Sequence, residues 1–142
     1  MQLNNINQPT ASANYFPVIT MHPSDLKLEK PDLTYLRDLA DNDPEFIREM
    51  IDAFVSDMPL MMASLESAWL SGNGKSVRMM AHKMKSSAQI VGLNRFALLA
   101  RTLEENCIGE SLPAKEVQVS IPEMRAILEQ AYSELERVSD TL

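Results

Sequence analysis

Apolar residues between positions 45 and 70 recur in alternating steps of four and three. The repeat runs through Ile47, Ile51, Phe54, Met58, Met61, Leu65 and Ala68. Such spacing places the side chains along one side of an α-helix, as in the seam of a helical bundle. Pro59 lies inside the repeat and removes one backbone hydrogen bond, so we expect this helix to kink or divide there.

Three later segments carry the same helical spacing. We predict helices from about Lys75 to Val91, from about Leu93 to Ile108, and from Ser120 to near the end of the chain. Each has one apolar stripe that the spacing predicts to be buried. The stripes are Val77, Met80, Ala81, Met84, Ala88 and Val91, then Phe96, Ala97, Ala100, Leu103 and Cys107, then Ile121, Met124, Leu128, Ala131, Leu135 and Val138.

Capping residues and helix breakers mark the ends of these helices. Asp43 can cap the long helix, and Pro44 suits its first position. Gly92 can close the second long helix with a left-handed residue. The segment Ser120–Glu123 has the pattern of a capping box, which predicts that the last helix begins there.

Four such helices, joined by short connections, predict an all-α fold, an antiparallel four-helix bundle. A short additional N-terminal helix, from Leu33 to about Ala40, should cover one end. Residues 31–142 would form this single domain. Residues 1–30 are rich in Asn, Gln, Pro, Ser and Thr and show no sustained period, so we expect a flexible N-terminal arm. His22 lies in this arm without other ligand types arranged around it.

Composition and charge narrow the classes of function. The 142 residues carry a net charge of −7, which disfavours binding to nucleic acid or an anionic membrane. No apolar run approaches the roughly 20 residues of a membrane span. The single cysteine, Cys107, excludes an internal disulfide, fits a reducing compartment, and is expected to be an inert core thiol. We therefore expect a cytoplasmic monomer.

The second predicted long helix carries one of only two histidines. His82 falls between Ala81 and Met84, both of which the apolar spacing buries. Polar residues occupy the opposite side of this helix, with Met79 beside them. The spacing therefore predicts an exposed imidazole rather than a core histidine. The residues on this side are Arg78, His82, Lys85, Ser86 and Gln89.

The sequence around His82 lacks acidic residues. No Asp or Glu occurs between Glu66 and Glu104, whereas this interval holds six of the thirteen basic residues. We expect a locally basic surface around His82 that suits an anionic group or an acidic partner. The alternative is that the basic residues cluster by chance on a solvent-exposed face and bind nothing. The roles of two of these basic residues stay open, because Lys83 and Arg95 can either line the site or only make the protein more soluble. The six are Lys75, Arg78, Lys83, Lys85, Arg95 and Arg101.

The neighbours of His82 limit its chemistry. No His, Cys, Asp or Glu lies three or four residues away, so no metal site is expected. No carboxylate accompanies His82 on this helix face, which argues against a catalytic triad. A nucleophilic imidazole remains. Lys85, one turn on, could neutralise charge on a phosphoryl group, and Ser86 is small enough to let a partner approach.

The segment HKMKSSAQIVG, residues 82–92, resembles the motif of histidine-containing phosphotransfer (HPt) domains, roughly H-x-L-K-G-[SA]-[SA]-x-x-x-G. Met84 replaces the usual Leu. Ser86 departs from the usual Gly, which puts the tightness of docking or the choice of partner in question. The resemblance covers about residues 32–139. The matching residues are His82, Lys85, Ser87, Ala88 and Gly92.

The resemblance implies a phosphorelay intermediate in two-component signal transduction. His82 would accept a phosphoryl group from a receiver-domain aspartyl-phosphate and pass it to another receiver aspartate, with Lys85 neutralising charge. The implied partners are receiver domains of hybrid sensor kinases and of response regulators. Met62 is a weaker docking candidate. The main docking residues would be Arg78, Met79, Lys83, Ser86 and Gln89.

The same resemblance implies no cofactor on this chain, because magnesium belongs to the receiver in this family. The sequence also has no Gly-rich phosphate loop, so no autonomous kinase activity is expected. Two other interpretations stay open. One is a non-catalytic helical adaptor that binds an acidic partner through the basic His82 face, and the other is a structural bundle with His82 buried.

Overall fold

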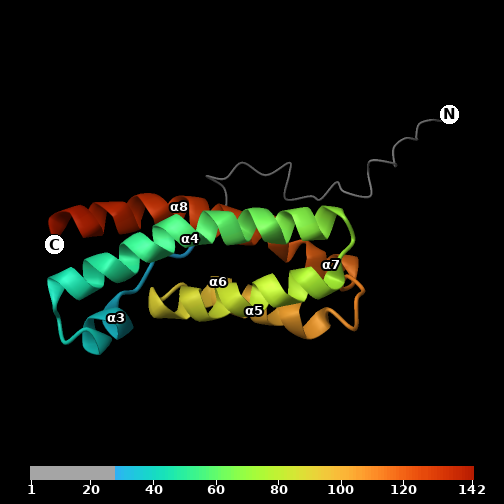
Figure 1. The fold of residues 1–142 in the computed structure, drawn as a ribbon, viewed down its shortest axis with the longest axis horizontal. Helices are drawn as coiled ribbons and strands as arrows, with labels where there is room; N and C mark the ends of the chain where they lie inside the picture. Colours follow the sequence, from blue (N-terminus) through green and yellow to red (C-terminus); the bar gives the residue numbers. More distant parts are fainter. Residues whose placement is uncertain (1–27) are drawn as a thin grey trace.

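The computed structural model describes residues 28–142, and its helices form one bundle (Figure 1). Four long helices run antiparallel, with α4 and α8 on one side and α5 and α6 on the other. The described residues contain no strand, so the prediction of an all-α four-helix bundle with a short N-terminal helix is confirmed. The helices are α3 (Thr34–Leu39), α4 (Pro44–Leu70), α5 (Gly74–Ile90), α6 (Asn94–Asn106), α7 (Lys115–Gln118) and α8 (Ser120–Thr141).

The predicted apolar stripes of α5, α6 and α8 form the core. All five predicted positions of α6 are buried. In α5 the prediction fails only for Met80, which is partly buried, and in α8 only for Val138. Ile127 joins the α8 stripe because a helical face in a bundle is wider than one residue per turn.

Helix α4 continues through Pro59 and changes direction near its middle (Figure 1). This agrees with the kink expected where proline removes a backbone hydrogen bond. The buried seam continues from Met58 through Met62 rather than Met61, so the prediction for Met61 is wrong. Steps of three and of four both stay on one side of a helix, and the period alone cannot choose between these neighbours.

The two predicted N-terminal caps have different outcomes. Asp43 caps α4 by accepting a hydrogen bond from the Glu45 amide at 3.1 Å. The capping box at Ser120 is wrong, because the Ser120 hydroxyl instead donates to the Val117 carbonyl at 2.7 Å. The short helix α7, which the sequence pattern did not reveal, keeps Val119 helical, so Ser120 lacks the extended geometry of a capping residue.

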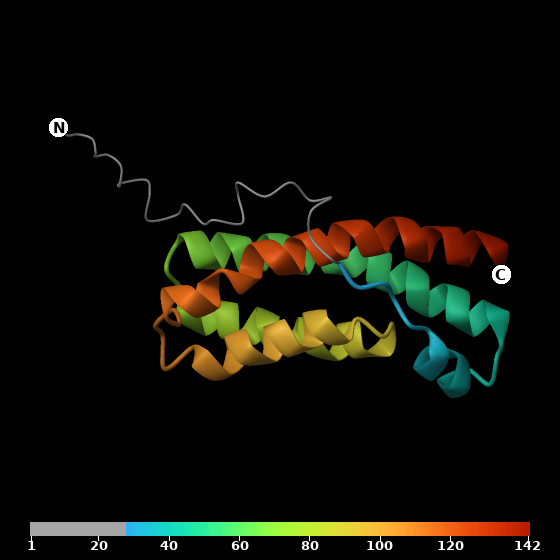
Figure 2. The ribbon, with the colours of Figure 1, turned by 180° about the vertical axis from the view of Figure 1, so that it is seen from behind.

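The segment before α3 crosses the back of the bundle from α8 towards α3 (Figure 2). Its first described residue, Leu28, packs against the core. The Glu29 carboxylate accepts hydrogen bonds from the amides of Arg95 and Phe96 at 2.9 and 2.6 Å, and so caps α6. Thus residues 28–30 of the proposed arm lie on the bundle, while residues 1–27, which include His22, lie outside the described residues.

The turn between α5 and α6 touches this same segment. Gly92 has a φ of +69°, as a left-handed cap requires. The Asp32 amide donates to the carbonyl of neighbouring Val91 at 3.1 Å. A Cβ atom on Gly92 would lie 1.9 Å from the Asp32 carbonyl oxygen. This close approach requires glycine, and it fixes the point at which α6 starts.

Candidate functional site

His82 lies in the middle of α5, and its side chain is 62% exposed. Its neighbours Ala81 and Met84 are fully buried, which turns the imidazole outward. The prediction of an exposed histidine is confirmed, and the interpretation of His82 as a core residue is wrong.

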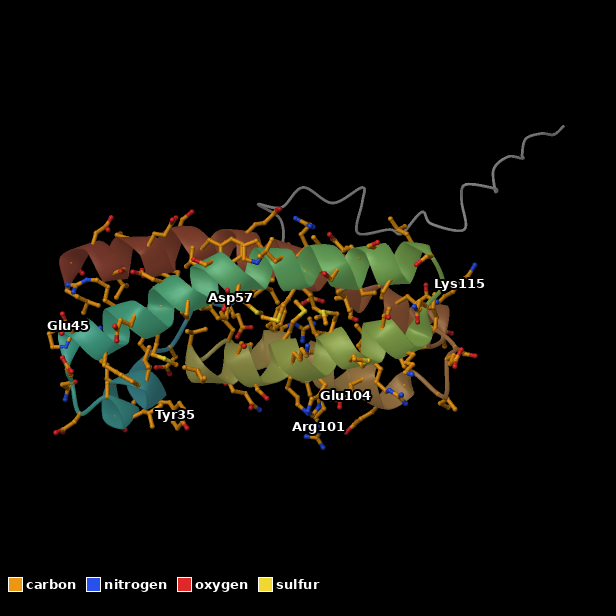
Figure 3. All side chains as sticks on the ribbon, viewed as in Figure 1. Tyr35, Glu45, Asp57, Arg101, Glu104 and Lys115 are labelled. Carbon is orange, nitrogen blue, oxygen red and sulfur yellow. The ribbon has the colours of Figure 1, made fainter. Side chains whose placement is uncertain are left out.

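A carboxylate from the next helix contacts the ring. Oε2 of Glu104, on α6, lies 2.6 Å from Nδ1 of His82. Oε1 of the same carboxylate accepts a hydrogen bond from Nζ of Lys85 at 3.0 Å. Figure 3 places Glu104 on the α5–α6 side of the bundle, close to Arg101. One carboxylate thus joins the histidine and the lysine of the motif.

The prediction that no carboxylate accompanies His82 is therefore wrong. It considered positions along one helix, whereas Glu104 comes from the helix that follows the turn. His82 lies ten residues before Gly92 and Glu104 twelve residues after it, so an antiparallel hairpin brings them level. Counting outward from Gly92 is the sequence signal that could have found this contact.

The contact with Glu104 determines which ring nitrogen of His82 carries the hydrogen. Burial raises the pKa of Glu104, but hydrogen bonds from Lys85 and His82 outweigh it and leave this pKa below its ordinary value. The carboxylate is therefore ionised at neutral pH and can only accept. Nδ1 of His82 must carry the hydrogen, and the neutral ring presents the lone pair of Nε2. No described residue forms a hydrogen bond with Nε2.

The other predicted site residues lie on the outward side of α5 around the ring. Met79 is a large apolar side chain that is 48% exposed. Arg78 is partly buried, and Lys83, Ser86 and Gln89 are exposed. Within the described part of the chain, only Lys85 shares a bonding partner with His82. Met62 is 2% exposed, so its prediction as a docking residue is wrong.

The surface around His82 is less basic than the sequence interval indicates. Besides Lys85, Arg101 pairs with Glu105 at 3.0 Å and Arg95 pairs with Glu123 of α8. Arg95 therefore points towards α8 and lies nine residues from Glu104, about 13 Å along α6. It does not line the site. Among the described ion pairs, three basic residues of the interval have no acidic partner. They are Lys75, Arg78 and Lys83.

A mostly apolar cavity of about 90 Å³ lies between α4 and α5. It starts at Ser87, directly after the exposed Ser86, and extends along α5 to Ile90 and Val91. Asp57 contributes an acidic group on the α4 side (Figure 3). The sequence did not predict this cavity, because it depends on how two helices pack. The α4 residues that line it include Met50, Ala53, Asp57 and Met61.

Residues 28–142 were also compared with the requirements of a metal site, a membrane span and a reactive cysteine. No group of three His, Cys, Asp or Glu side chains there could hold a metal ion. None of the helices in this part is long and apolar enough to cross a membrane. Cys107 is 4% exposed, and burial raises the pKa of its thiol although Arg78 opposes the shift. This agrees with a core thiol.

Comparison with known proteins identifies the family. The family model described as Hpt domain matches residues 49–138. Among solved structures, the chain is similar to histidine-containing phosphotransfer protein B (HptB) from Pseudomonas aeruginosa PAO1, with a TM-score of 0.63 and 19% identity over 79% of this chain and 96% of that chain. No curated protein matches. The solved structure supports the fold, and the family model shows that this chain belongs to the HPt domain family.

Proposed function

We propose that this protein is a phosphorelay intermediate in which His82 carries the phosphoryl group. The observation that carries the proposal is an exposed imidazole in an HPt domain, with Nδ1 engaged by Glu104 and Nε2 open to a partner. An imidazole nitrogen with a free lone pair is an effective nucleophile at neutral pH.

The proposed transfer needs no metal or nucleotide on this chain. The Nε2 lone pair of His82 attacks the phosphorus of a receiver-domain aspartyl-phosphate. The P–N bond forms as the P–O bond breaks, and the aspartate leaves as a carboxylate. A second receiver reverses these steps when its aspartate attacks the phosphorus. Magnesium, held by the receiver, would stabilise the charge on the phosphoryl oxygens.

Lys85 would neutralise charge on the transferring group. Its ammonium carries three hydrogens. Nζ lies 3.0 Å from Oε1 of Glu104, so one hydrogen is donated there and the other two stay available for phosphoryl oxygens. A lysine next to the reacting phosphoryl group supports the transition state without taking part in covalent chemistry.

The receiver would dock over the outward side of α5. Met79 offers an apolar contact, and Arg78 and Lys83 offer positive charge without acidic partners in the described chain. The hydroxymethyl group of Ser86 replaces the hydrogen of the family's usual glycine, and lies where a partner must come close. Gln89 and the α4–α5 cavity would extend this surface away from the ring.

The test is transfer from a phosphorylated receiver domain, with the wild-type chain and His82→Gln compared side by side. We expect an acid-labile, base-stable phosphoryl group on the wild type and none on the variant. Labelling of His82→Gln would show that the wrong residue was assigned. Binding of a receiver without labelling of the wild type would instead support a non-catalytic adaptor.

A further inference from the structure

We propose that residues 15–21 of the chain's own N-terminal arm bind in the cavity between α4 and α5 and compete there with the receiver. The segment reads YFPVITM. The competition rests on the proposed function, whereas the binding of the arm does not. Neither the family match to residues 49–138 nor the motif at His82 includes this segment.

The cavity has room for one apolar side chain. Its volume of about 90 Å³ is smaller than the roughly 150 Å³ that accepts a benzene-sized ligand, so it suits a side chain of a polypeptide better than a free small molecule. Three apolar residues of its wall, Met50, Met61 and Ile90, pack against the core but stay only partly buried. The two methionines can adapt their shape to an incoming group. A segment that covers this wall would remove apolar surface from water.

The sequence of the arm provides such a segment. Five of the seven residues at 15–21 are Tyr, Phe, Val, Ile or Met, whereas residues 1–14 contain only three large apolar side chains. Residues 1–24 contain no Asp or Glu, so Asp57, which lines the cavity, does not repel them. Pro17 disfavours a helix through the cluster, and we therefore expect the segment to bind in an extended form.

The arm is long enough to reach the cavity. Leu28 packs against the core, and Glu29 contacts the start of α6 at the back of the bundle (Figure 2). The cavity lies between α4 and α5, on the side seen in Figure 1. A chain that passes from back to front must cover roughly two helix diameters, about 20–25 Å. Ile19 and Phe16 precede Leu28 by nine and twelve residues, which span about 30 to 40 Å when extended.

An arm bound in the cavity would lie next to the proposed docking surface. Ser87 lines the cavity and directly follows Ser86, which is exposed on that surface. The arm and the receiver would therefore exclude each other from this part of α5. Because the arm is tethered, its effective concentration at the cavity is of the order of 1 mM. With an intrinsic dissociation constant of about 0.1–0.5 mM, it would weaken binding of the receiver about 3- to 10-fold.

The first test needs no receiver and uses the full chain with ¹³C-labelled methionine methyl groups. A nitroxide is attached to the thiol of Ser12→Cys, because the native Cys107 is only 4% exposed and does not compete for the label. We expect the methyl signals of Met50 and Met61, which line the cavity, to lose intensity. The signal of Met124, which is fully buried on α8, should lose much less.

Two pairs of substitutions in the arm decide the outcome. Phe16→Ser with Ile19→Ser should abolish the selective loss of intensity. Leu3→Ser with Ile6→Ser also replaces two apolar residues three positions apart, and should leave the loss unchanged. Equal loss for all methionines, or a loss that survives the first pair, overturns the binding of the arm. Selective loss between separate nitroxide-labelled and ¹³C-labelled chains would place the arm on a second copy and overturn binding within one chain.

The second test measures transfer from a phosphorylated receiver at a concentration below saturation. Phe16→Ser with Ile19→Ser should speed the labelling of His82 about 3- to 10-fold, whereas the control pair in the arm should leave the rate unchanged. Equal rates for all three chains would refute the competition. If none of them accepts the phosphoryl group, the proposed function fails together with the competition, while the NMR result decides the binding of the arm by itself.

Discussion

At the scale of single residues, the site depends on how one carboxylate is shared. Glu104 accepts from His82 through one oxygen and from Lys85 through the other. The two contacts make different contributions to the proposed chemistry. His82 gains a defined tautomer, whereas Lys85 is held within one turn of the ring on a side chain that otherwise has many rotamers. Removing the lysine should therefore affect the rate of transfer but not the nitrogen that reacts.

We expect Lys85→Ala to slow transfer from a receiver by about 10- to 100-fold, because a charge that faces the phosphoryl group is lost. Rapid-quench measurement of phosphohistidine formation gives this rate. Lys115→Ala removes the same charge from an exposed position on α7, outside the docking surface and without an ion pair in the described chain, and should change the rate less than about threefold. The product should remain Nε2-phosphohistidine in both variants. Equal effects of the two substitutions would mean that Lys85 contributes only general positive charge.

At the scale of elements, the start of α6 determines where Glu104 lies. Glu29 caps that start, and the carbonyl of Asp32 packs against Gly92 in the preceding turn. The N-terminal segment, which the family match to residues 49–138 does not include, therefore holds the helix that carries Glu104. The site depends on this packing although no residue of the segment touches His82.

Gly92→Ala should destabilise the fold strongly. The left-handed backbone costs a residue with a Cβ about 1–2 kcal/mol, and the collision with the Asp32 carbonyl should bring the total to about 3 kcal/mol or more. Gly72→Ala separates the two effects, because its φ is +73° but no atom lies within 4 Å of the added Cβ. It should cost only about 1–2 kcal/mol in urea unfolding. Similar losses for both variants would show that the close approach of Asp32 contributes nothing.

The sequence could predict features that depend on a single helix, but not those that depend on how helices pack together. Periodicity identified the four long helices and the exposed side of α5, because both follow from one helix considered alone. The choice of Met62 over Met61, the short α7 and the failed cap at Ser120 depend on neighbouring elements. Glu104 belongs to this second group, since residues on two helices meet only after the hairpin forms. Acidic residues are thus absent from the sequence around His82, but Glu104 lies next to it in the folded structure.

At the scale of the whole molecule, a chain of net charge −7 retains a small positive area. Acids from outside the interval neutralise half of its basic residues. Arg78, one turn before His82, keeps its charge without an acidic partner in the described residues, as do Lys75 and Lys83. An aspartyl-phosphate is anionic, so this area would attract a receiver that the rest of the surface repels. Association should therefore weaken as salt concentration rises.

Arg78→Glu should lower the association rate with a phosphorylated receiver about 5- to 10-fold at low ionic strength. The difference should shrink towards zero near 1 M salt, where the Debye length is about 3 Å. Arg37→Glu provides the matched control, because Arg37 is exposed on α3 at one end of the bundle and the net charge changes equally. Stopped-flow association kinetics measure both variants across a salt series. If Arg37→Glu slows association as much as Arg78→Glu, net charge rather than the area around His82 governs the encounter.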